Sequence, residues 1–298
     1  MEQGGPAPRR PRLDDLSVVI PTIGRAILRR SLAAIADGNH WPARVIVVDQ
    51  SASAEVAGWL AELAARGLDT LHVPSAERGR ALGVNRGIER VETAFLAITD
   101  DDCLVAPEWA QQMATALRAH PDSIVTGRVD AAGGEDVAMV VDAPAAFIHE
   151  RPSLRFDPLS GGNMGASRRI FERVGTFEED PRILFAEDGE WAYRALRQGV
   201  ALRYEPDVIV AHYGWRDAAE RQRQYANYAR SQGAFYGKFI RRGDGFILLR
   251  AGLHLLRAGL RWLRGSLAGD VEQARIGRAY ASQLLPGIAS MFRARTSP

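Results

Sequence analysis

Residues 95–103 read FLAITDDDC, a short apolar run that ends on three consecutive aspartates. An apolar run of this length, bounded by charge, is typical of a strand buried inside a parallel sheet. Asp100, Asp101 and Asp102 would then lie together at the edge of that sheet, where their mutual repulsion must be offset by a cation. A divalent metal ion is the most economical cation, so the stretch predicts a metal site.

Similar apolar runs recur along the first half of the chain and alternate with helical patterns. The runs span residues 16–20, 44–48, 70–73, 95–99 and 123–126, and apolar spacing of three and four occupies residues 25–36, 54–66, 80–91 and 109–119. Four strand–helix units predict an open α/β sheet, mostly parallel and flanked by helices. Ligands of such sheets bind beyond the carboxyl ends of the strands, so the residues that follow each run are the candidates for function.

The composition is that of an ordinary globular protein. The chain has 298 residues, of which 46% are hydrophobic and 25% are charged. This is enough for one large core with an appended helical region. The only cysteine, Cys103, excludes an internal disulfide and favours a reducing compartment. A small buried hydrophobe is the simpler interpretation of Cys103, and a metal ligand is the alternative.

Composition also divides the chain into three regions. Residues 1–15 are rich in Pro, Gly and Arg and lack the apolar segment of a signal peptide, so we expect a disordered lead-in and a cytoplasmic protein. Residues 16–215 carry the α/β pattern, which loses its rhythm after about residue 130. Residues 216–298 are helical in pattern. Residues 239–298 hold 10 arginines and 3 acids although the whole chain has a net charge of only +2, so an acidic body carries a basic tail.

Six short motifs occur in one order along the α/β region. They are VVIPT with Arg25, VVDQS around Asp49, ERGRA leading to NRGI (residues 77–88), TDDD (99–102), GNM (162–164) and AED (186–188). Together they resemble family 2 glycosyltransferases of the GT-A fold. The resemblance implies that residues 16–129 bind a nucleotide-diphospho-sugar donor and that residues 130–215 form the acceptor half.

The same resemblance implies a reaction. It is the inverting, metal-dependent transfer of a sugar to a hydroxyl of a glycan or lipid-linked glycan, in the synthesis of a cell-surface polysaccharide or glycolipid. Mn²⁺ or Mg²⁺ held at the acidic triplet would stabilise the charge that develops on the departing diphosphate. The ion would serve as a Lewis acid and as a clamp.

By this resemblance, the acids at the strand ends belong to the donor site. Asp102 would be the metal ligand and Asp100 would touch the ribose or the water shell of the metal. Asp101 is placed at the donor too, although its side chain would point away if directions alternate along the triplet. Asp49 would hydrogen-bond the nucleobase or ribose, and Gln50 replaces the second acid of that motif. A helix N-cap or a plain turn acid is the structural alternative for these residues.

The remaining donor contacts are expected from residues after the first and third runs: Pro21, Thr22, Arg25, Arg78 and Asn85. The backbone around Thr22 would reach the nucleotide, and Arg25 would approach a phosphate or stay solvated at a helix start. Arg78 would contact base or phosphate, with Arg80 as the alternative. Asn85 would tie the loop down from within its helix.

The acceptor side is expected to supply the base that takes the proton of the attacking hydroxyl. We assign this role to Asp188. Glu187 is the competing base, and both acids also suit a helix start without any catalytic role, because the helix dipole favours negative charge there. The expected acceptor contacts are Glu187, Trp215 and Asn163, the last within a flexible glycine loop over residues 161–165; Trp191 is a second aromatic that could stack on a sugar.

His212 follows the apolar run 208–211 and resembles the additional metal ligand of many GT-A enzymes. Carboxylate and imidazole together would favour Mn²⁺ somewhat over Mg²⁺. A hydrogen-bonded structural histidine is the alternative.

The basic tail contains one regular pattern, with no acid in residues 246–267. Arg250, His254, Arg257, Arg261 and Arg264 would form one stripe of a helix, beside Leu249, Leu253, Leu256, Leu260 and Leu263. Such a helix suits peripheral contact with an anionic membrane, for example the inner face of the cell membrane, and hence a lipid-linked acceptor. Packing on the body and contact within a homo-oligomer are the alternatives. We expect no nucleic-acid binding, because no recognised module accompanies the charge.

Two other functions compete with glycosyl transfer. A sugar nucleotidyltransferase would share the core and the metal, but it requires a glycine-rich phosphate loop after the first run, which residues 21–25 lack. A non-catalytic glycan-binding or membrane scaffold protein would keep the fold without turnover.

Overall fold

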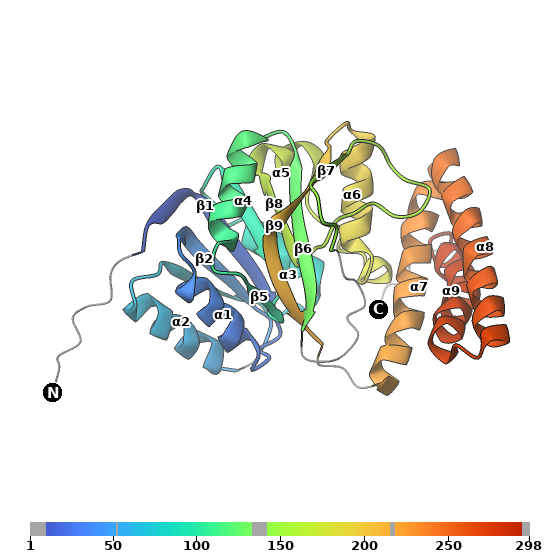
Figure 1. Cartoon of the computed structure of the whole chain (residues 1–298), viewed down its shortest axis with the longest axis horizontal. Coiled ribbons are helices and arrows are strands. Elements are labelled where there is room, and N and C mark those ends of the chain that lie inside the picture. Colours follow the sequence, from blue (N-terminus) through green and yellow to red (C-terminus); the bar gives the residue numbers. More distant parts are fainter. Residues whose placement is uncertain (1–9, 52, 133–141, 215–217, 294–298) are drawn as a thin grey trace. The chain divides into compact units, whose positions relative to one another are not determined.

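The computed structural model describes residues 10–51, 53–132, 142–214 and 218–293. The chain forms two compact units. The first comprises residues 1–151, 158–176 and 195–214, and the second comprises residues 152–157, 177–194 and 215–298. The first unit is built around a sheet and the second around helices (Figure 1). Each unit has a hydrophobic core of its own.

Nine strands form the sheet of the first unit within the described residues. They are β1 (Arg12–Thr22), β2 (Trp41–Asp49), β3 (Thr70–Pro74), β4 (Phe95–Thr99), β5 (Cys103–Val105), β6 (Ile124–Ala132), β7 (Phe147–His149), β8 (Asn163–Ser167) and β9 (Leu202–Tyr213). Their order is β3-β2-β1-β4-β8-β6-β9-β5, and β7 pairs with β9. Strands β3, β2, β1 and β4 are mutually parallel, so their carboxyl ends share one edge.

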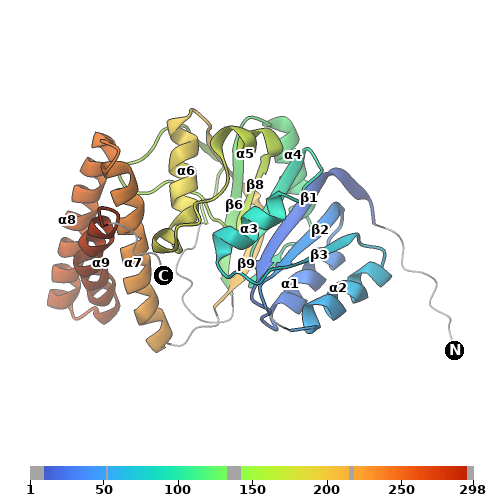
Figure 2. The ribbon, with the colours of Figure 1, turned by 180° about the vertical axis from the view of Figure 1, so that it is seen from behind.

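Helices cover both faces of this sheet. They are α1 (Leu28–Asp37), α2 (Glu55–Ala65), α3 (Arg80–Ile88), α4 (Trp109–Ala119) and α5 (Arg168–Val174), while α6 (Glu187–Arg197) contributes residues to both units. Figure 1 shows α1, α2 and α4 in front of the sheet, and Figure 2 shows α3 and α5 in front from behind. The predicted α/β sheet with flanking helices is confirmed.

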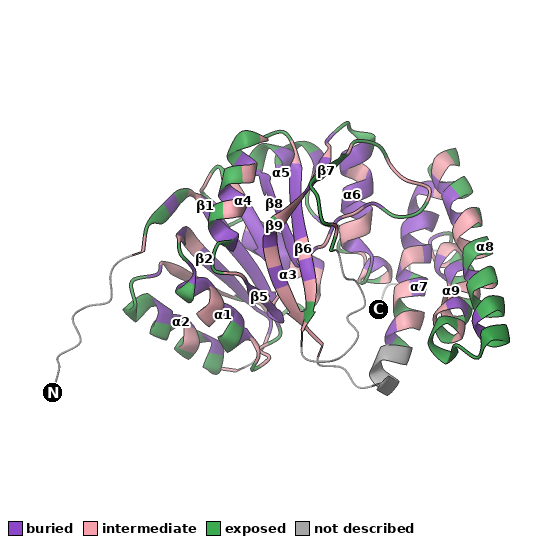
Figure 3. Cartoon of the chain, viewed as in Figure 1, coloured by how far each residue is buried: buried purple, intermediate pink, exposed green. Residues whose placement is uncertain are grey.

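The two faces follow from alternation along each strand. Leu16, Val18 and Ile20 of β1 belong to one core cluster with α1, α2 and α4. Val19 points to the other face, where a Cβ on Gly87 of α3 would lie 2.3 Å from its Cγ1. The central strands β1, β4 and β8 are almost wholly buried on both sides, and the middle of the sheet is largely purple in Figure 3. Burial on both faces explains why the strands read as continuous apolar runs.

The second half of the sheet contains antiparallel pairs that the apolar pattern of the sequence did not predict. Strand β8 pairs antiparallel with β4 and with β6. Its residues Asn163 and Gly165 were expected in a flexible loop, but β8 is buried throughout. Small residues here serve packing, because a Cβ on Gly165 would lie 2.7 Å from Sδ of Met113. The loop prediction is therefore wrong from residue 163 onward.

The start of the sheet also differs from expectation. Strand β1 begins at Arg12, inside the segment 1–15 that we expected to be disordered; residues 1–9 lie outside the described residues. The Trp41 amide donates to the Pro11 carbonyl at 2.9 Å, and Leu13 is buried. A single leucine among charged residues carries no detectable period, which is why the sequence did not indicate a strand there.

The second unit contains the C-terminal helices α7 (Ala218–Ile240), α8 (Gly245–Ala268) and α9 (Val271–Ser290) and the short 3₁₀ helix η1 (Pro181–Ile183). Asp244 caps α8 by accepting from the amides of Phe246 and Ile247 at 3.1 and 3.2 Å. Gly269 ends α8 with a φ of 70°, a conformation that favours glycine.

Small residues let these helices approach closely. A Cβ on Gly233 of α7 would lie 2.1 Å from the Leu284 carbonyl oxygen of α9. None of the described helices is both long enough and apolar enough to cross a bilayer.

Candidate functional site

The acidic triplet forms a turn between β4 and β5. The Cys103 amide donates to the Asp100 carbonyl at 3.1 Å, and the Tyr213 amide of β9 donates to the Asp102 carbonyl at 2.9 Å. Because the chain turns here, the alternation of side chains that holds along a strand does not apply. The three carboxylates consequently point toward different neighbours.

Asp101 is a buried anchor. Its carboxylate accepts from the Thr22 hydroxyl at 2.7 Å and from Nε of Arg25 at 3.2 Å, with a further contact to Nη2 of the same guanidinium. Its carbonyl accepts from the Ser31 hydroxyl of α1 at 2.8 Å. Burial raises the pKa of Asp101, and the Arg25 guanidinium opposes that shift. Asp101 thus joins β1 and α1 to the triplet, which replaces the expected contact with the donor.

Asp100 lies beside Arg80, the first residue of α3. Nε of Arg80 donates to Oδ1 of Asp100 at 2.8 Å, and both side chains are partly exposed. Arg78, the arginine preferred from the sequence, is exposed. Of Arg78 and its alternative Arg80, it is therefore Arg80 that contacts the acidic triplet. The position of Arg80 directly after Gly79, at the start of a helix, was the sequence feature that could have identified it.

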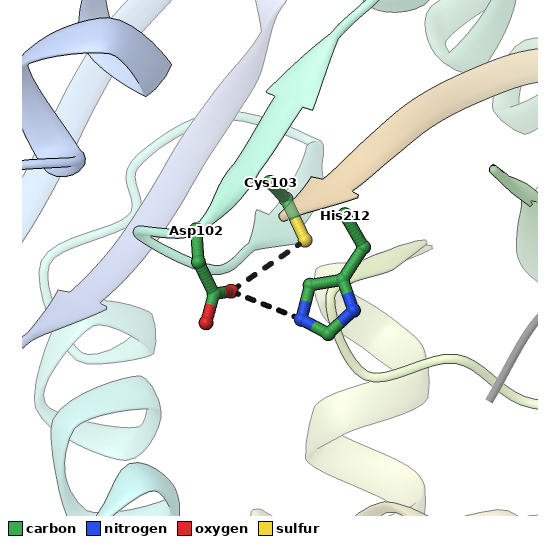
Figure 4. A group of neighbouring side chains, drawn as sticks. All are labelled: Asp102, Cys103 and His212. Atoms are coloured by element: carbon green, nitrogen blue, oxygen red, sulfur yellow. Dashed lines mark hydrogen bonds and ion pairs between the residues drawn. The ribbon is translucent and has the colours of Figure 1, made fainter. Parts of the chain in front are cut away.

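Asp102 and His212 are brought together by the pairing of β5 with β9 (Figure 4). Nε2 of His212 lies 3.3 Å from Oδ1 of Asp102, and Nη2 of Arg25 lies 3.2 Å from Oδ2. Cys103 is the direct cross-strand partner of His212, and its Sγ lies 3.9 Å from Oδ1 of Asp102. Direct cross-strand partners share one face of a sheet.

These three side chains fit a metal ion. One carboxylate oxygen, one imidazole nitrogen and the thiol sulfur all lie within 4.8 Å of one another. Burial and the nearby carboxylates of Asp100 and Asp102 raise the pKa of the Cys103 thiol well above its usual range, so the thiol is neutral until a cation displaces its proton. The thiol was the donor that sequence analysis ranked below a buried hydrophobe.

Charge compensation at the triplet does not depend on a metal. Arg80 pairs with Asp100, and Arg25 pairs with both Asp101 and Asp102. The argument that repulsion alone requires a divalent ion is therefore corrected, because two guanidinium groups already offset the charge. The metal assignment rests instead on the mixed donor set.

Asp49 and Gln50 brace the neighbouring loops. Oδ1 of Asp49 accepts from the Ser51 amide at 2.8 Å and its Oδ2 lies 3.0 Å from Nε2 of His72. The Gln50 amide group donates to the Gly79 carbonyl at 2.8 Å and accepts from the Gly79 amide at 3.3 Å. Gly79 has a φ of 146°, so this bracing holds the glycine that starts α3.

The other donor residues from the sequence lie in the same part of the first unit. Thr22 and Pro21 are buried at the end of β1, next to the end of β2. Thr22 also accepts from the Gly24 amide at 2.9 Å, so its hydroxyl organises the turn. Asn85 is buried within α3.

The acids at the start of α6 differ in their surroundings, which belong to the second unit. Glu190 is fully buried, with Lys238 at 2.5 Å and Arg194 at 2.9 Å. Glu187 is buried, whereas Asp188 is partly exposed and its Oδ1 accepts from the Gly189 amide at 2.7 Å. Asp188 is therefore the most accessible of the three carboxylates.

Asn163 and Trp191, which were both expected near the acceptor, are buried in the structure. Asn163 is fully buried: its Oδ1 accepts from the Trp109 indole at 2.8 Å, and its Nδ2 donates to the carbonyls of Arg128 and Val208 at 2.9 and 2.8 Å. It joins three strands and a helix instead of facing an acceptor. Trp191 is buried in a stack on Phe177 with ring centroids 5.1 Å apart. Trp215 lies outside the described residues.

The chain is similar in sequence to two curated proteins. The chain is 27% identical over 213 residues to the pre-mycofactocin glycosyltransferase of Mycobacterium tuberculosis (strain CDC 1551 / Oshkosh), an alignment that covers 69% of this chain and 44% of the relative. It is 24% identical over 241 residues to the chondroitin synthase of Escherichia coli, covering 67% of this chain and 35% of the relative. The chain thus spans less than half the length of these relatives.

Solved structures of low identity share the fold. The mannosyltransferase PcManGT from Pyrobaculum calidifontis, in complex with GDP-Man and Mn²⁺, matches with a TM-score of 0.61 at 16% identity over 95% of this chain and 86% of that one. TarS 1-349 of S. aureus, in complex with UDP-GlcNAc, matches with a TM-score of 0.54 at 13% identity over 89% of this chain and 91% of that one.

The family model of glycosyl transferase family 2 matches residues 17–196, well over half of the chain. These residues hold strands β2, β3 and β4, most of β1, the acidic triplet and Asp188. The chain belongs to glycosyl transferase family 2 and has the GT-A fold of its glycosyltransferases.

Proposed function

We propose that this protein transfers a sugar, with inversion, from a nucleotide-diphospho-sugar donor to a hydroxyl of a glycan or lipid-linked glycan. The observation that carries the proposal is the group formed by Asp102, His212 and Cys103 where β5 pairs with β9 in a GT-A sheet. Structural neighbours with the same fold bind GDP-Man and UDP-GlcNAc, which supports a nucleotide sugar as the class of donor.

We propose Mn²⁺ or Mg²⁺ as the cofactor, held by Asp102 and His212. Such an ion, when bound, neutralises the charge that develops on a departing diphosphate. Imidazole in the donor set favours Mn²⁺ of the two. Nη2 of Arg25 lies 3.2 Å from Oδ2 of Asp102, so this guanidinium would compete with the ion for the carboxylate.

We assign the base to Asp188, from its place in the family motif and from its accessibility. Glu190 is held by Lys238 and Arg194, so its carboxylate serves the fold. Asp188 would accept the proton of the acceptor hydroxyl as that oxygen attacks the sugar carbon. Asp49, with its fixed carboxylate, is proposed to position the nucleoside.

The test is a donor panel. Purified protein with Mn²⁺ and single nucleotide sugars should release the nucleoside diphosphate from at least one donor, and Asp102→Ala should lower that release at least 100-fold, because the charge on the leaving group loses its main stabilisation. Asp122→Ala removes an exposed aspartate elsewhere in the first unit and should leave the rate unchanged.

Two results would contradict the proposal. One is the absence of nucleoside diphosphate with every donor of the panel. The other is equal calorimetric affinity of the wild-type protein and Asp102→Ala for the donor in the presence of Mn²⁺. Release of pyrophosphate in place of a nucleoside diphosphate would identify a nucleotidyltransferase.

A further inference from the structure

Helix α8 has a buried face and an exposed apolar face. Ala251, Ala258 and Gly265, spaced seven residues apart, are buried in the second unit. The large apolar side chains of the same helix that are exposed by 41–79% are Leu248, Leu249, Leu256, Leu260, Trp262, Leu263 and Leu267. The green of exposed residues accordingly runs along much of α8 in Figure 3.

The exposed leucines form one continuous stripe. Leu249, Leu256 and Leu263 are also seven residues apart and precede the buried small residues by two positions each. At 3.6 residues per turn, two positions correspond to roughly 200°, so the stripe lies opposite the buried face. Contiguous exposed apolar surface on a soluble protein marks a surface that another body covers.

The charges beside this stripe have one sign. Arg257, Arg261 and Arg264 are exposed, and α8 contains no acidic residue. Two of the five basic residues expected in this stripe are not exposed to solvent as charges. Arg250 is buried, with Nη1 2.6 Å from Oδ2 of Asp157. His254 packs between Tyr236 and Tyr280.

The combination of leucines and arginines favours a lipid surface over a second copy of this chain as the partner that covers the exposed face of α8. A second copy of α8 would bring three further arginines to the interface and no carboxylate from either helix. An anionic lipid surface offers acyl chains to the leucines and phosphates to the arginines.

We propose that α8 lies on the surface of an anionic bilayer, with the Leu249–Leu256–Leu263 stripe among the acyl chains and the three arginines at lipid phosphates. The helix lies on the bilayer and does not span it. This proposal is independent of the proposed transfer reaction, since Asp102, Cys103 and His212 all lie outside α8.

Sedimentation with vesicles tests this surface on the full chain. The protein should bind vesicles of equimolar phosphatidylglycerol and phosphatidylcholine and bind pure phosphatidylcholine at least tenfold more weakly. Leu256→Ser with Leu263→Ser should lower binding to the anionic vesicles at least tenfold, because two side chains lose their burial. Leu285→Ser with Phe292→Ser, which removes two exposed apolar side chains outside α8, is the matched control and should bind as the wild type does.

The arginines have a matched control as well. Arg257→Gln with Arg264→Gln should weaken binding at least tenfold, since each arginine near the surface contributes about fivefold. Arg275→Gln with Arg278→Gln, exposed on α9, removes equal charge and should have a smaller effect. Equal losses in both pairs would overturn the assignment to α8.

Other outcomes would also overturn the proposal. These are absence of binding to anionic vesicles at low salt, or full binding by the leucine variant. A dimer of the wild type in light scattering that the leucine variant abolishes, without vesicle binding, would show that a second copy covers the face. All variants alter exposed side chains, and equal melting temperatures will confirm that they fold.

Discussion

At the scale of single residues, three consecutive aspartates are stable here because each has a cationic neighbour. Arg80 pairs with Asp100, and Arg25 is shared by Asp101 and Asp102. A buried carboxylate without such a partner would carry a large desolvation cost. A metal ion at Asp102 therefore competes with Arg25 rather than filling a site that repulsion keeps open.

The thiol of Cys103 should set the metal preference of the site. Cys103→Ser should lower the affinity for Zn²⁺ and Cd²⁺ at least tenfold and leave that for Mg²⁺ within about twofold, because a hydroxyl retains little attraction for soft ions. Competition dialysis measures the affinities. With Co²⁺, the wild type should also show a thiolate-to-metal absorption band that the variant lacks. An unchanged preference would show that the thiol only packs.

Replacing the carboxylate by an amide should affect two acids of α6 differently: catalysis at Asp188 and stability at Glu190. Asp188→Asn should lower kcat by 10²- to 10⁴-fold with little change in melting temperature, because it removes a base from a partly exposed site. Glu190→Gln should destabilise the fold by about 3 kcal/mol, because Lys238 and Arg194 lose their buried partner. Calorimetry and steady-state kinetics on both variants separate the two roles. A folded Asp188→Asn variant with full activity would remove Asp188 from the mechanism.

At the scale of elements, the sheet positions the site through close packing and through strand pairing. Helix α3 lies against β1 and β2 at Gly87, where an added Cβ would meet Val19 at 2.3 Å and Val48 at 3.3 Å. This packing fixes the end of α3 against the sheet, while the hydrogen bonds between Gln50 and Gly79 hold its start, and hence Arg80, near the triplet. The pairing of β5 with β9 does the same for Cys103 and His212.

Two helical glycines should therefore respond in opposite directions to substitution by alanine. Gly87→Ala should lower the free energy of unfolding by about 1–3 kcal/mol, because the methyl group overpacks against Val19. Gly58→Ala on α2 meets nothing within 4 Å and should raise it by about 0.5–1 kcal/mol through helix propensity. Denaturant titration of both variants provides the measurement. Stabilisation by Gly87→Ala would mean that α3 is free to shift away from β1.

At the scale of the whole molecule, the second unit contains a largely enclosed titratable group, His254, that links its stability to pH. Burial, followed by the charges of Arg250, Arg257 and Arg261, lowers the pKa of His254 from 6.5 to about 4. The Tyr236 hydroxyl lies 3.1 Å from Nδ1 and the Tyr280 ring stacks on the imidazole. The folded protein thus holds this histidine neutral.

The sign of the pH dependence follows from that shift. Protonation favours the unfolded chain, so the stabilising effect of neutral His254 is complete above pH 6.5 and is lost as the pH falls toward 4. The loss should be on the order of 2–3 kcal/mol. Unfolding titrations between these pH values, compared with His254→Gln, isolate the effect, because the variant lacks the titrating group. Parallel pH profiles for the two proteins would contradict the prediction.

The order of elements and the family motifs could be read from the sequence, because local periodicity and strand-end chemistry are encoded by neighbours along the chain. The five apolar runs became β1, β2, β3, β4 and β6, and the predicted helices lie within a few residues of the observed ones. Strand β8 could not be read in this way, because its small residues pack only against segments that are distant in sequence.

The partners of the functional side chains were likewise decided only by the tertiary structure. Contacts between distant segments pair Arg25 with Asp101 and bring Arg80, rather than Arg78, to Asp100. They also bury Asn163 in the core, where its side chain is hydrogen-bonded. The sequence by itself determined which residues stand at the ends of the strands. Folding decided which of them touch, because hydrogen bonds and ion pairs depend on distance in space and not on separation along the chain.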